Sequence, residues 1–174
     1  MTSEAARRAP LRYALWLALT LAPVSASAAL FNDNDTARLA GVNEAIQTFQ
    51  DEVNAALHEL SPDSAEEIQS YSYVGLNLEA AHERLNDVFI LIAVSTYLES
   101  ATDELLVLNL MHAQLLRQSR NYLSEKESNI SSMAAAHPAN PKFAAYSDRA
   151  KAILRDRAIP LLNEFYRRID ELPH

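Results

Sequence analysis

Glu79 and His82 are the residues whose types and spacing come closest to a metal site. They stand three positions apart, which places them on one face of a helix. Di-iron bundles use Glu-x-x-His twice, together with two further glutamates. This sequence has the motif once, because Asn109 occupies the position three before His112. We therefore expect a solvated Glu79 and His82, and a metal site at Glu79, His82 and His112 is the alternative.

His112 directly follows Met111, and both residue types ligate haem iron in some proteins. Neighbouring residues of a helix point about 100° apart, so these two cannot bind one iron from opposite sides. A second ligand such as Met133 or His58 would be needed. We expect instead a core histidine bonded to a polar neighbour such as Ser119. No cofactor is expected, and a metal-binding or haem-binding four-helix bundle is the alternative function.

Tyr71 and Tyr73 form a small aromatic cluster just before Gly75. Tyrosines are common anchors in protein interfaces, which makes the pair a candidate partner-binding site. Packing against another helix is the competing interpretation. Because the stretch from Tyr71 to Gly75 favours helix only weakly, it also allows a kink there.

Motifs of catalysis are missing from the sequence. There is no Gly-x-Ser-x-Gly, no Gly-rich phosphate loop and no His-Glu-x-x-His. No catalytic residues are predicted. Enzymatic activity stays open and is less expected than binding.

The elements that position these residues are predicted to be helices. Only two glycines, Gly41 and Gly75, occur in the chain, whereas a β-rich fold needs many turns. A first helix is expected over about 36–60, preceded by capping residues at Asp33 to Asp35. Its apolar residues alternate at spacings of three and four, which is typical of helices packed side by side: Leu39, Val42, Ile46, Phe49, Val53, Ala56 and Leu60.

Two further helices follow. One starts near Ser64 and has a seam of the same spacing, made by Val74, Leu78, Ala81, Leu85, Val88 and Ile92. Residues 89–94 are apolar all round and are expected at the centre of the bundle. The next helix is expected over about 102–136, with two apolar stripes. One contains Leu105, Leu108, Met111, Leu115 and Tyr122, and the other contains His112, Leu116, Ser119, Leu123, Ile130 and Met133.

The last helix is expected to start at Asn140-Pro141 and to kink or restart near Ala158, because Pro160 lacks a backbone donor. Its seam comprises Phe143, Tyr146, Ala150, Ile153, Leu162, Phe165, Ile169 and Leu172. Short connections make sequential helices antiparallel. The predicted fold is all-α, an up-down bundle of about four long helices that forms a single domain over 29–174.

Residues 1–28 have the pattern of a cleaved signal peptide. Arg7, Arg8 and Arg12 precede an apolar stretch over 13–24, and Ala26-Ser27-Ala28 matches the cleavage pattern. The arginine pair loosely resembles a twin-arginine signal. Twelve helical residues span about 18 Å, too short to cross a bilayer. We expect a periplasmic or secreted protein with no membrane insertion after cleavage, and the absence of cysteine excludes disulfides.

The net charge of the chain restricts the classes of molecule that it is expected to bind. The chain carries a formal charge of −8, and removing residues 1–28 leaves 12 basic and 22 acidic residues, or −10. Such a domain repels nucleic acid and anionic lipid. Arginines gather on the last two predicted helices and are expected on the solvated surface or opposite acids of the first two: Arg117, Arg120, Arg155, Arg157, Arg167 and Arg168. The predicted function is protein–protein binding or self-association, as an adaptor, inhibitor or helper.

Overall fold

The computed structural model describes residues 30–97, 102–137 and 140–171. The predicted signal peptide over 1–28 and the last predicted seam position, Leu172, lie outside these ranges. All regular structure within them is helical. The helices are α2 (Asp33–His58), α3 (Ala65–Tyr97), α4 (Thr102–Ala136), α5 (Pro141–Ala152), a short π-helix η2 (Ile153–Ala158) and α6 (Ile159–Asp170). Because α5, η2 and α6 follow one another without a break, they form the fourth long helix of the bundle.

The first helix begins three residues earlier than its expected bound. Asn32 caps α2 by accepting from the backbone N–H groups of Asn34 and Asp35, and the Asp35 carboxylate accepts from the backbone N–H of Asn32. This reciprocal capping box satisfies donors that a helix start leaves free. The predicted seam is buried from Leu39 to Ala56, whereas Leu60 lies past the helix end and is half-buried.

The seam of α3 is buried at each predicted position from Val74 to Ile92. The helix is continuous through Tyr71 to Gly75, so this weakly helical stretch does not interrupt it. The prediction for residues 89–94 is wrong: Ile92 is buried, but Ile90 and Val94 are 53% and 49% exposed. Each helix of a four-helix bundle buries only the face that points into the core, so apolar residues on its other face stay in contact with solvent.

One of the two stripes predicted on α4 is buried from His112 to Ile130, whereas its last residue, Met133, is half-buried. His112, Leu116, Ser119, Leu123 and Ile130 point into the core. The neighbouring stripe is less buried than predicted, since Leu115 and Tyr122 are half-buried and Met111 is 56% exposed. The side chains of residues 95–109, among them the predicted positions Leu105 and Leu108, lie outside the described set.

The fourth helix contains the irregularity expected from Pro160. Asn140 caps α5 by accepting from the backbone N–H of Phe143 at 2.9 Å. The helix then widens into η2, where the N–H of Ile159 reaches the carbonyl of Leu154, five residues back. Since Pro160 has no N–H and cannot close an ordinary turn onto Asp156, we attribute the π-turn to this proline.

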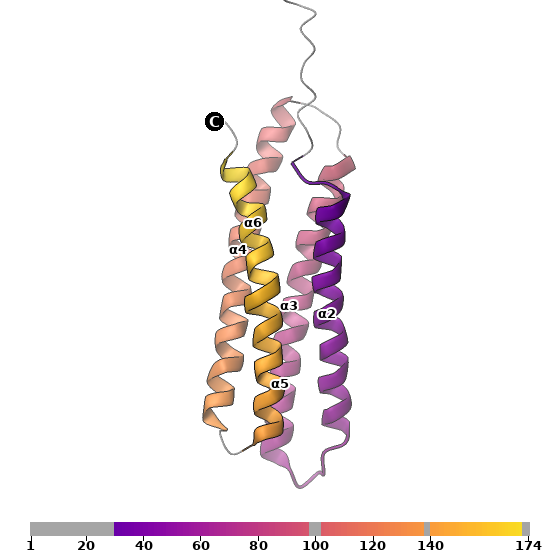
Figure 1. The fold of residues 1–174 in the computed structure, drawn as a ribbon, viewed down its shortest axis with the longest axis vertical. Helices are drawn as coiled ribbons and strands as arrows, with labels where there is room; N and C mark the ends of the chain where they lie inside the picture. The colour runs from indigo at the N-terminus through magenta and orange to yellow at the C-terminus, as the bar shows by residue number, and fades with distance from the viewer. Residues whose placement is uncertain (1–29, 98–101, 138–139, 172–174) are drawn as a thin grey trace, which may run out of the picture.

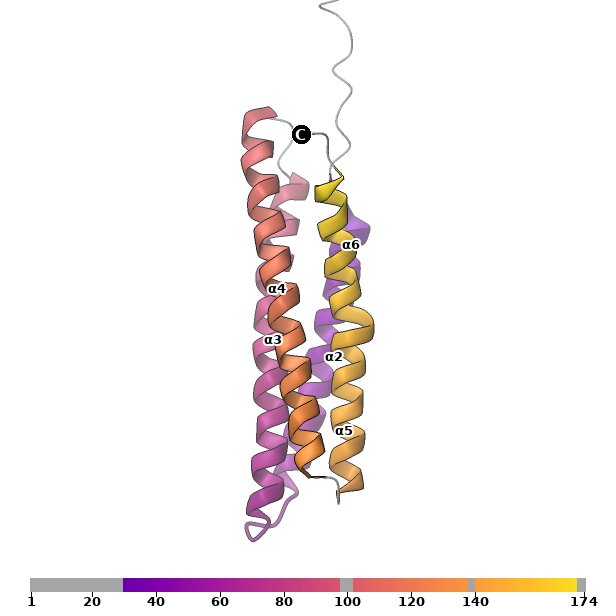
Figure 2. The ribbon, with the colours of Figure 1, turned by 90° about the vertical axis from the view of Figure 1, so that its left-hand side faces the viewer.

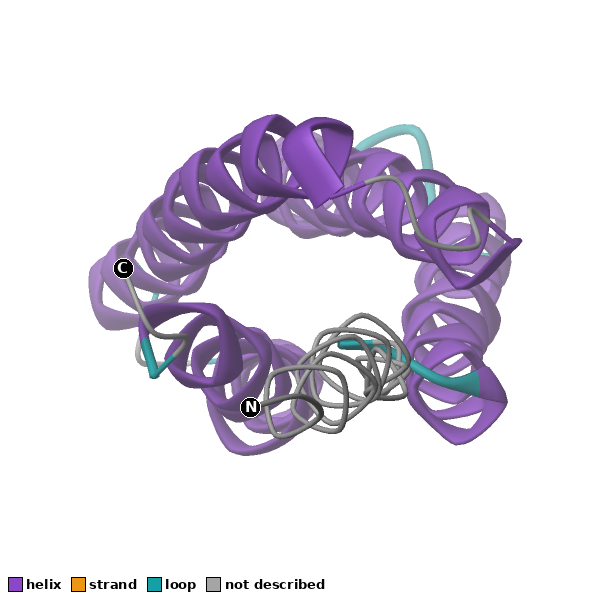
Figure 3. Cartoon of the chain, turned by 90° about the horizontal axis from the view of Figure 1, so that it is seen from above, coloured by secondary structure: helices purple, strands orange, loops and turns teal. Residues whose placement is uncertain are grey.

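The four long helices pack as an antiparallel bundle, with α2 beside α3, α3 beside α4, and α4 beside the fourth helix (Figures 1 and 2). Seen along its length, the bundle is a ring of helices whose buried faces share one core (Figure 3). The start of α2, the end of α3, the start of α4 and the end of α6 lie at the same end, where the first turns of α4 project past α2 and α6 (Figures 1 and 2). Among the described residues, no helix has a stretch apolar and long enough to cross a membrane.

Candidate functional site

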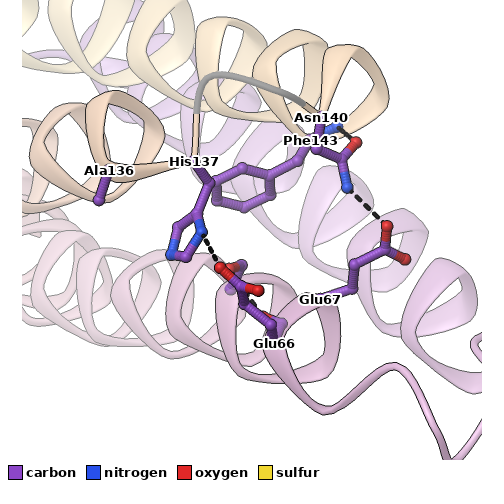
Figure 4. Close-up of a pocket in the computed structure, with 7 residues that line it drawn as sticks. Glu66, Glu67, Ala136, His137, Asn140 and Phe143 are labelled. Carbon is purple, nitrogen blue, oxygen red and sulfur yellow. Dashed lines mark hydrogen bonds and ion pairs between the residues drawn. The ribbon is translucent and has the colours of Figure 1, made fainter.

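A hollow of about 310 Å³ lies at the end of the bundle opposite the start of α2 (Figures 1 and 4). The first turns of α3 contribute Glu66, Glu67 and Ser70, and the α4–α5 region contributes the other walls, which include His137, Asn140 and Phe143. His137 Nδ1 is 2.9 Å from Glu66 Oε1, and Asn140 Nδ2 donates to Glu67 Oε1 at 2.9 Å. The Phe143 ring stands edge-on to His137 at 6.2 Å.

These contacts tie the α4–α5 connection to the start of α3. Glutamates in the first turn of a helix are favoured by its dipole, so Glu66 and Glu67 are stabilised there without a ligand. The Glu66 side chain is 78% exposed, which leaves its pairing with His137 in high dielectric and worth little energy. Both carboxylates already have a partner. We interpret the hollow as a structural joint that holds the helix ends together.

His112 lies near the other end of the bundle, deep in the core. It is 1% exposed, its Nε2 is 3.4 Å from the carbonyl of Leu91, and its ring meets Phe31 edge-on at 5.6 Å. The polar neighbour considered from the sequence, Ser119, is buried, and its Oγ makes no hydrogen bond to a described residue. Of the second ligands considered, Met133 lies on the same helix as His112 and His58 ends α2 at the opposite end of the bundle. Neither residue is therefore placed to share an iron with His112.

Glu79 and His82 share one side of α3, as the spacing predicts. Glu79 is exposed and His82 is half-buried, with a buried Nδ1 that makes no described hydrogen bond. His112 is on α4, in the part of the bundle nearer the α3–α4 connection. Among the described residues, no group of three or more His, Asp or Glu side chains is arranged to hold a metal ion.

The two candidate tyrosines differ in burial. Tyr71 is 2% exposed and packs against Phe143 and Tyr146 at ring distances of 5.6 and 5.4 Å. Burial is the main cause of the raised pKa of its hydroxyl. Tyr73 is half-buried. Tyr71 therefore has the contacts of a core residue that joins α3 to α5.

An ionic cluster joins α2 to α6. Arg38 donates two bonds to Glu164, at 2.8 and 2.6 Å, and Arg168 donates to Asp35 Oδ2 at 2.6 Å and also to Glu164. Hydrogen bonds from Arg38, and then from Arg168, lower the pKa of Glu164 to about 2. Asp35 is 1% exposed, and it is satisfied by Arg168 and by the N–H of Asn32. Of the clustered arginines, Arg168 is thus opposite an acid of the first helix.

The surface feature that stands out is apolar. Four of the large hydrophobic residues that are most exposed lie on α3 and α4 near their connection, and we call them the α3–α4 patch: Ile90 (53%), Val94 (49%), Leu110 (64%) and Met111 (56%). The sequence contained the signal for this patch, because residues 89–94 are apolar on all sides of the helix. A helix buried on one side only would leave part of such a segment exposed.

No family model matches this sequence, and no curated protein or solved structure matches it either.

Proposed function

We propose that this chain is an exported helical bundle that works by binding another protein chain through the α3–α4 patch. The observation that carries the proposal is the exposure of Ile90, Val94, Leu110 and Met111 on two adjacent helices. Surface hydrophobic residues scattered singly are ordinary, but neighbouring ones are characteristic of interaction sites. When a partner covers Met and branched aliphatic side chains, the water around them is released, which lowers the free energy of the complex.

The predicted cleavage site is compatible with the described bundle. Leu30 is half-buried and Phe31 is 2% exposed, with its ring against His112 of α4 and Phe165 of α6. Cleavage after Ala28 removes the apolar leader and leaves this anchor intact. We propose that the mature bundle starts at Ala29 and acts in the periplasm or outside the cell.

Site-specific cross-linking tests the binding function. A photoreactive residue replaces Ile90 in one variant and Leu110 in another, and the cells are irradiated in their own growth medium. Both variants are expected to give discrete adducts, because a partner that covers the patch excludes water and holds the probe against itself. The matched control carries the same probe at Glu44, an exposed residue of α2.

Two further comparisons sharpen the test. Leu110→Asp, combined with the probe at Ile90, is expected to abolish the adducts because a charge at the centre of the patch opposes desolvation. Equal adducts at Glu44 and at Ile90, or none at Ile90 and Leu110, would reject a docking function for the patch.

A further inference from the structure

Three arginines without an ion pair gather where α4 lies beside α6. Most other described arginines are matched by acids, in the ionic cluster of α2 and α6 and in three further pairs: Arg84 with Asp87, Arg149 with Glu52 and Arg155 with Asp156. Arg117, Arg120 and Arg167, in contrast, form no ion pair with any described residue. In a chain with a formal charge of −8, arginines left without a carboxylate on one side of the bundle are distinctive.

The contact between Arg120 and Asn163 shows which side of each helix these arginines occupy. Arg120 Nη1 donates to Asn163 Oδ1 at 3.5 Å, so Arg120 lies on the α6 side of α4. Arg117 stands three residues before Arg120, and Arg167 stands four residues after Asn163, so each shares a helical face with its neighbour.

The antiparallel packing brings these residues to matching heights. From the contact between Arg120 and Asn163, Arg117 lies about 4.5 Å and Arg167 about 6 Å toward the same end of the bundle. Arg117 and Arg167 are both exposed. We call Arg117, Arg120, Asn163 and Arg167 the α4–α6 basic face.

Arg120 is held in place by uncharged groups. It is half-buried, and its Nε and Nη2 donate to Asn121 Oδ1 at 3.3 and 3.1 Å, in addition to the bond from Nη1 to Asn163. A guanidinium has five N–H donors, so one on Nη1 and one on Nη2 are not used by described residues. Amide oxygens fix the direction of the guanidinium without neutralising its charge. The side chain is therefore positioned in advance for an anion, which lowers the entropy cost of binding one.

The acids closest to this face along the chain do not neutralise it. Glu164 is turned toward α2, where it accepts hydrogen bonds from Arg38, and it is also bound by Arg168 of its own helix. Asp170 and Glu171, at the end of α6, are exposed and form no ion pair with a described residue. The positive charge of the basic face therefore remains available to a ligand.

From this arrangement we infer that the α4–α6 basic face binds a short acidic segment of another protein, whose carboxylates pair with Arg117 and Arg120. Guanidinium groups match carboxylates in both shape and charge, and such charge-assisted bonds are the strong ones. This face needs no contact with the α3–α4 patch, so the inference goes beyond the docking function proposed above.

The charge distribution favours a short peptide segment over a long polyanion. The mature chain carries a formal charge of −10, which repels nucleic acid or an anionic membrane over a wide surface. Interactions between exposed charges are screened beyond about 8 Å at physiological ionic strength. A short segment that covers only the basic face is therefore attracted by the nearby arginines and hardly affected by acids on the far side.

Binding of a defined acidic peptide tests the inference. The probe is a rhodamine-labelled peptide of alternating glutamate and alanine, titrated with the mature chain and followed by fluorescence anisotropy. Saturable binding is expected, and it should weaken as salt is added because the contacts are between exposed charges. The same peptide with glutamine in place of glutamate is expected not to bind.

Charge-neutralised variants locate the binding. Arg117→Gln/Arg120→Gln is expected to raise the dissociation constant of the peptide at least about tenfold. The matched control is Lys142→Gln/Arg157→Gln, which removes the same charge at exposed positions of α5 and η2 and should bind like the parent chain. Because Arg120 also contacts Asn163, Arg117→Gln alone is compared as well. Its side chain bonds to no described residue, so it should weaken binding while melting like the parent chain.

The opposite results are equally clear. Absence of saturable binding at low salt, or arginine variants that bind like the parent, would overturn the inference. Equal losses in the two double variants would show that only net charge matters, which overturns it too. A single-stranded DNA of the same charge serves as competitor and is expected not to displace the peptide. Displacement by the DNA would overturn the assignment to an acidic protein segment.

Discussion

Phe49 shows how one seam residue connects several helices. It is 1% exposed on α2, its ring stacks on Tyr146 of α5 at 5.7 Å, and the Arg149 guanidinium lies over it at 4.6 Å. Tyr146 in turn meets Tyr71 of α3. A change at Phe49 therefore disturbs three helices at once.

We expect Phe49→Asp to unfold the bundle or to lower its melting temperature strongly. The substitution removes an aromatic core residue, worth about 3–5 kcal/mol in such sites, and buries an unpaired carboxylate in its place. Thermal unfolding followed by circular dichroism measures the effect. Thr48→Asp, at the neighbouring exposed position, is the control and should melt close to the parent chain. Similar melting of both variants would mean that the seam is not buried.

Glu164 makes the stability of the bundle depend on pH. Its folded pKa is lowered to about 2 from an ordinary value of 4.5, first by Arg38 and then by Arg168. A lowered carboxyl pKa adds stability above pH 4.5, and that contribution is lost as the pH falls from about 4.5 towards 2. Since the side chain is 34% exposed, solvent screening reduces the contribution to about 1–2 kcal/mol.

We therefore expect Glu164→Gln to be less stable than the parent chain at pH 7 by about 1–2 kcal/mol, with the difference shrinking as the pH approaches 2. Urea unfolding at a series of pH values tests this. Glu44→Gln, at an exposed position of α2 with no ion pair among the described residues, is the matched control and should stay close to the parent chain at each pH. A difference for Glu164→Gln that stays constant from pH 7 to pH 2 would show that the carboxylate charge is not the cause.

At the scale of residues, the sequence predicted which side chains are buried better than it predicted which hydrogen bonds they make. Spacing alone placed Phe49 and Leu85 in the core, because the three-and-four pattern defines one face of a helix whatever packs on it. It did not predict that His112 would meet the carbonyl of Leu91, since that contact depends on how α3 and α4 are rotated relative to each other. The same rotation decides that Met111 faces solvent.

At the scale of elements, local chemistry defined the helix starts. Asn140-Pro141 begins α5 and Thr102 begins α4, both as predicted. For α5 the cause is local, because the Asn140 cap and Pro141 act within one turn. The irregularity expected near Ala158 is present as a π-turn over Ile153–Ala158, and the helix continues through it without a break. The sequence identified the proline that causes it, but a proline allows either a kink or a widened turn, so the form was not predicted.

The N-cap of α5 gives the element-scale prediction. Asn140 both caps the helix through Phe143 N–H and donates to Glu67 of α3. Asn140→Ala is expected to lose both contacts and about 1–2 kcal/mol of unfolding free energy. Asn140→Ser keeps a capping oxygen and loses only the bond to Glu67, which is exposed, so it should lose clearly less. Equal losses for the two variants in urea unfolding would assign the effect to the Glu67 contact.

At the scale of the whole molecule, the antiparallel bundle followed from short connections between long amphipathic helices. The α3–α4 patch was not predicted, because residues 89–94 were assigned to the centre of the bundle from their composition alone. Composition reports how apolar a segment is, but neighbours decide how much of it is covered.

The last prediction concerns Phe31, which lies just before α2. Phe31 fills the space between His112 and Phe165, at ring distances of 5.6 and 5.3 Å, and is 2% exposed. A chain that starts at Ala29 should therefore be more stable than one that starts at Asn32, by about 3 kcal/mol or more, since losing this ring leaves a cavity against α4 and α6. Urea unfolding of the two chains measures the difference, and a chain starting at Ala29 with Phe31→Leu separates the loss of volume from the loss of the segment. Equal stability of all three chains would mean that Phe31 does not anchor the bundle, and the argument that places the mature start at Ala29 would lose its structural support.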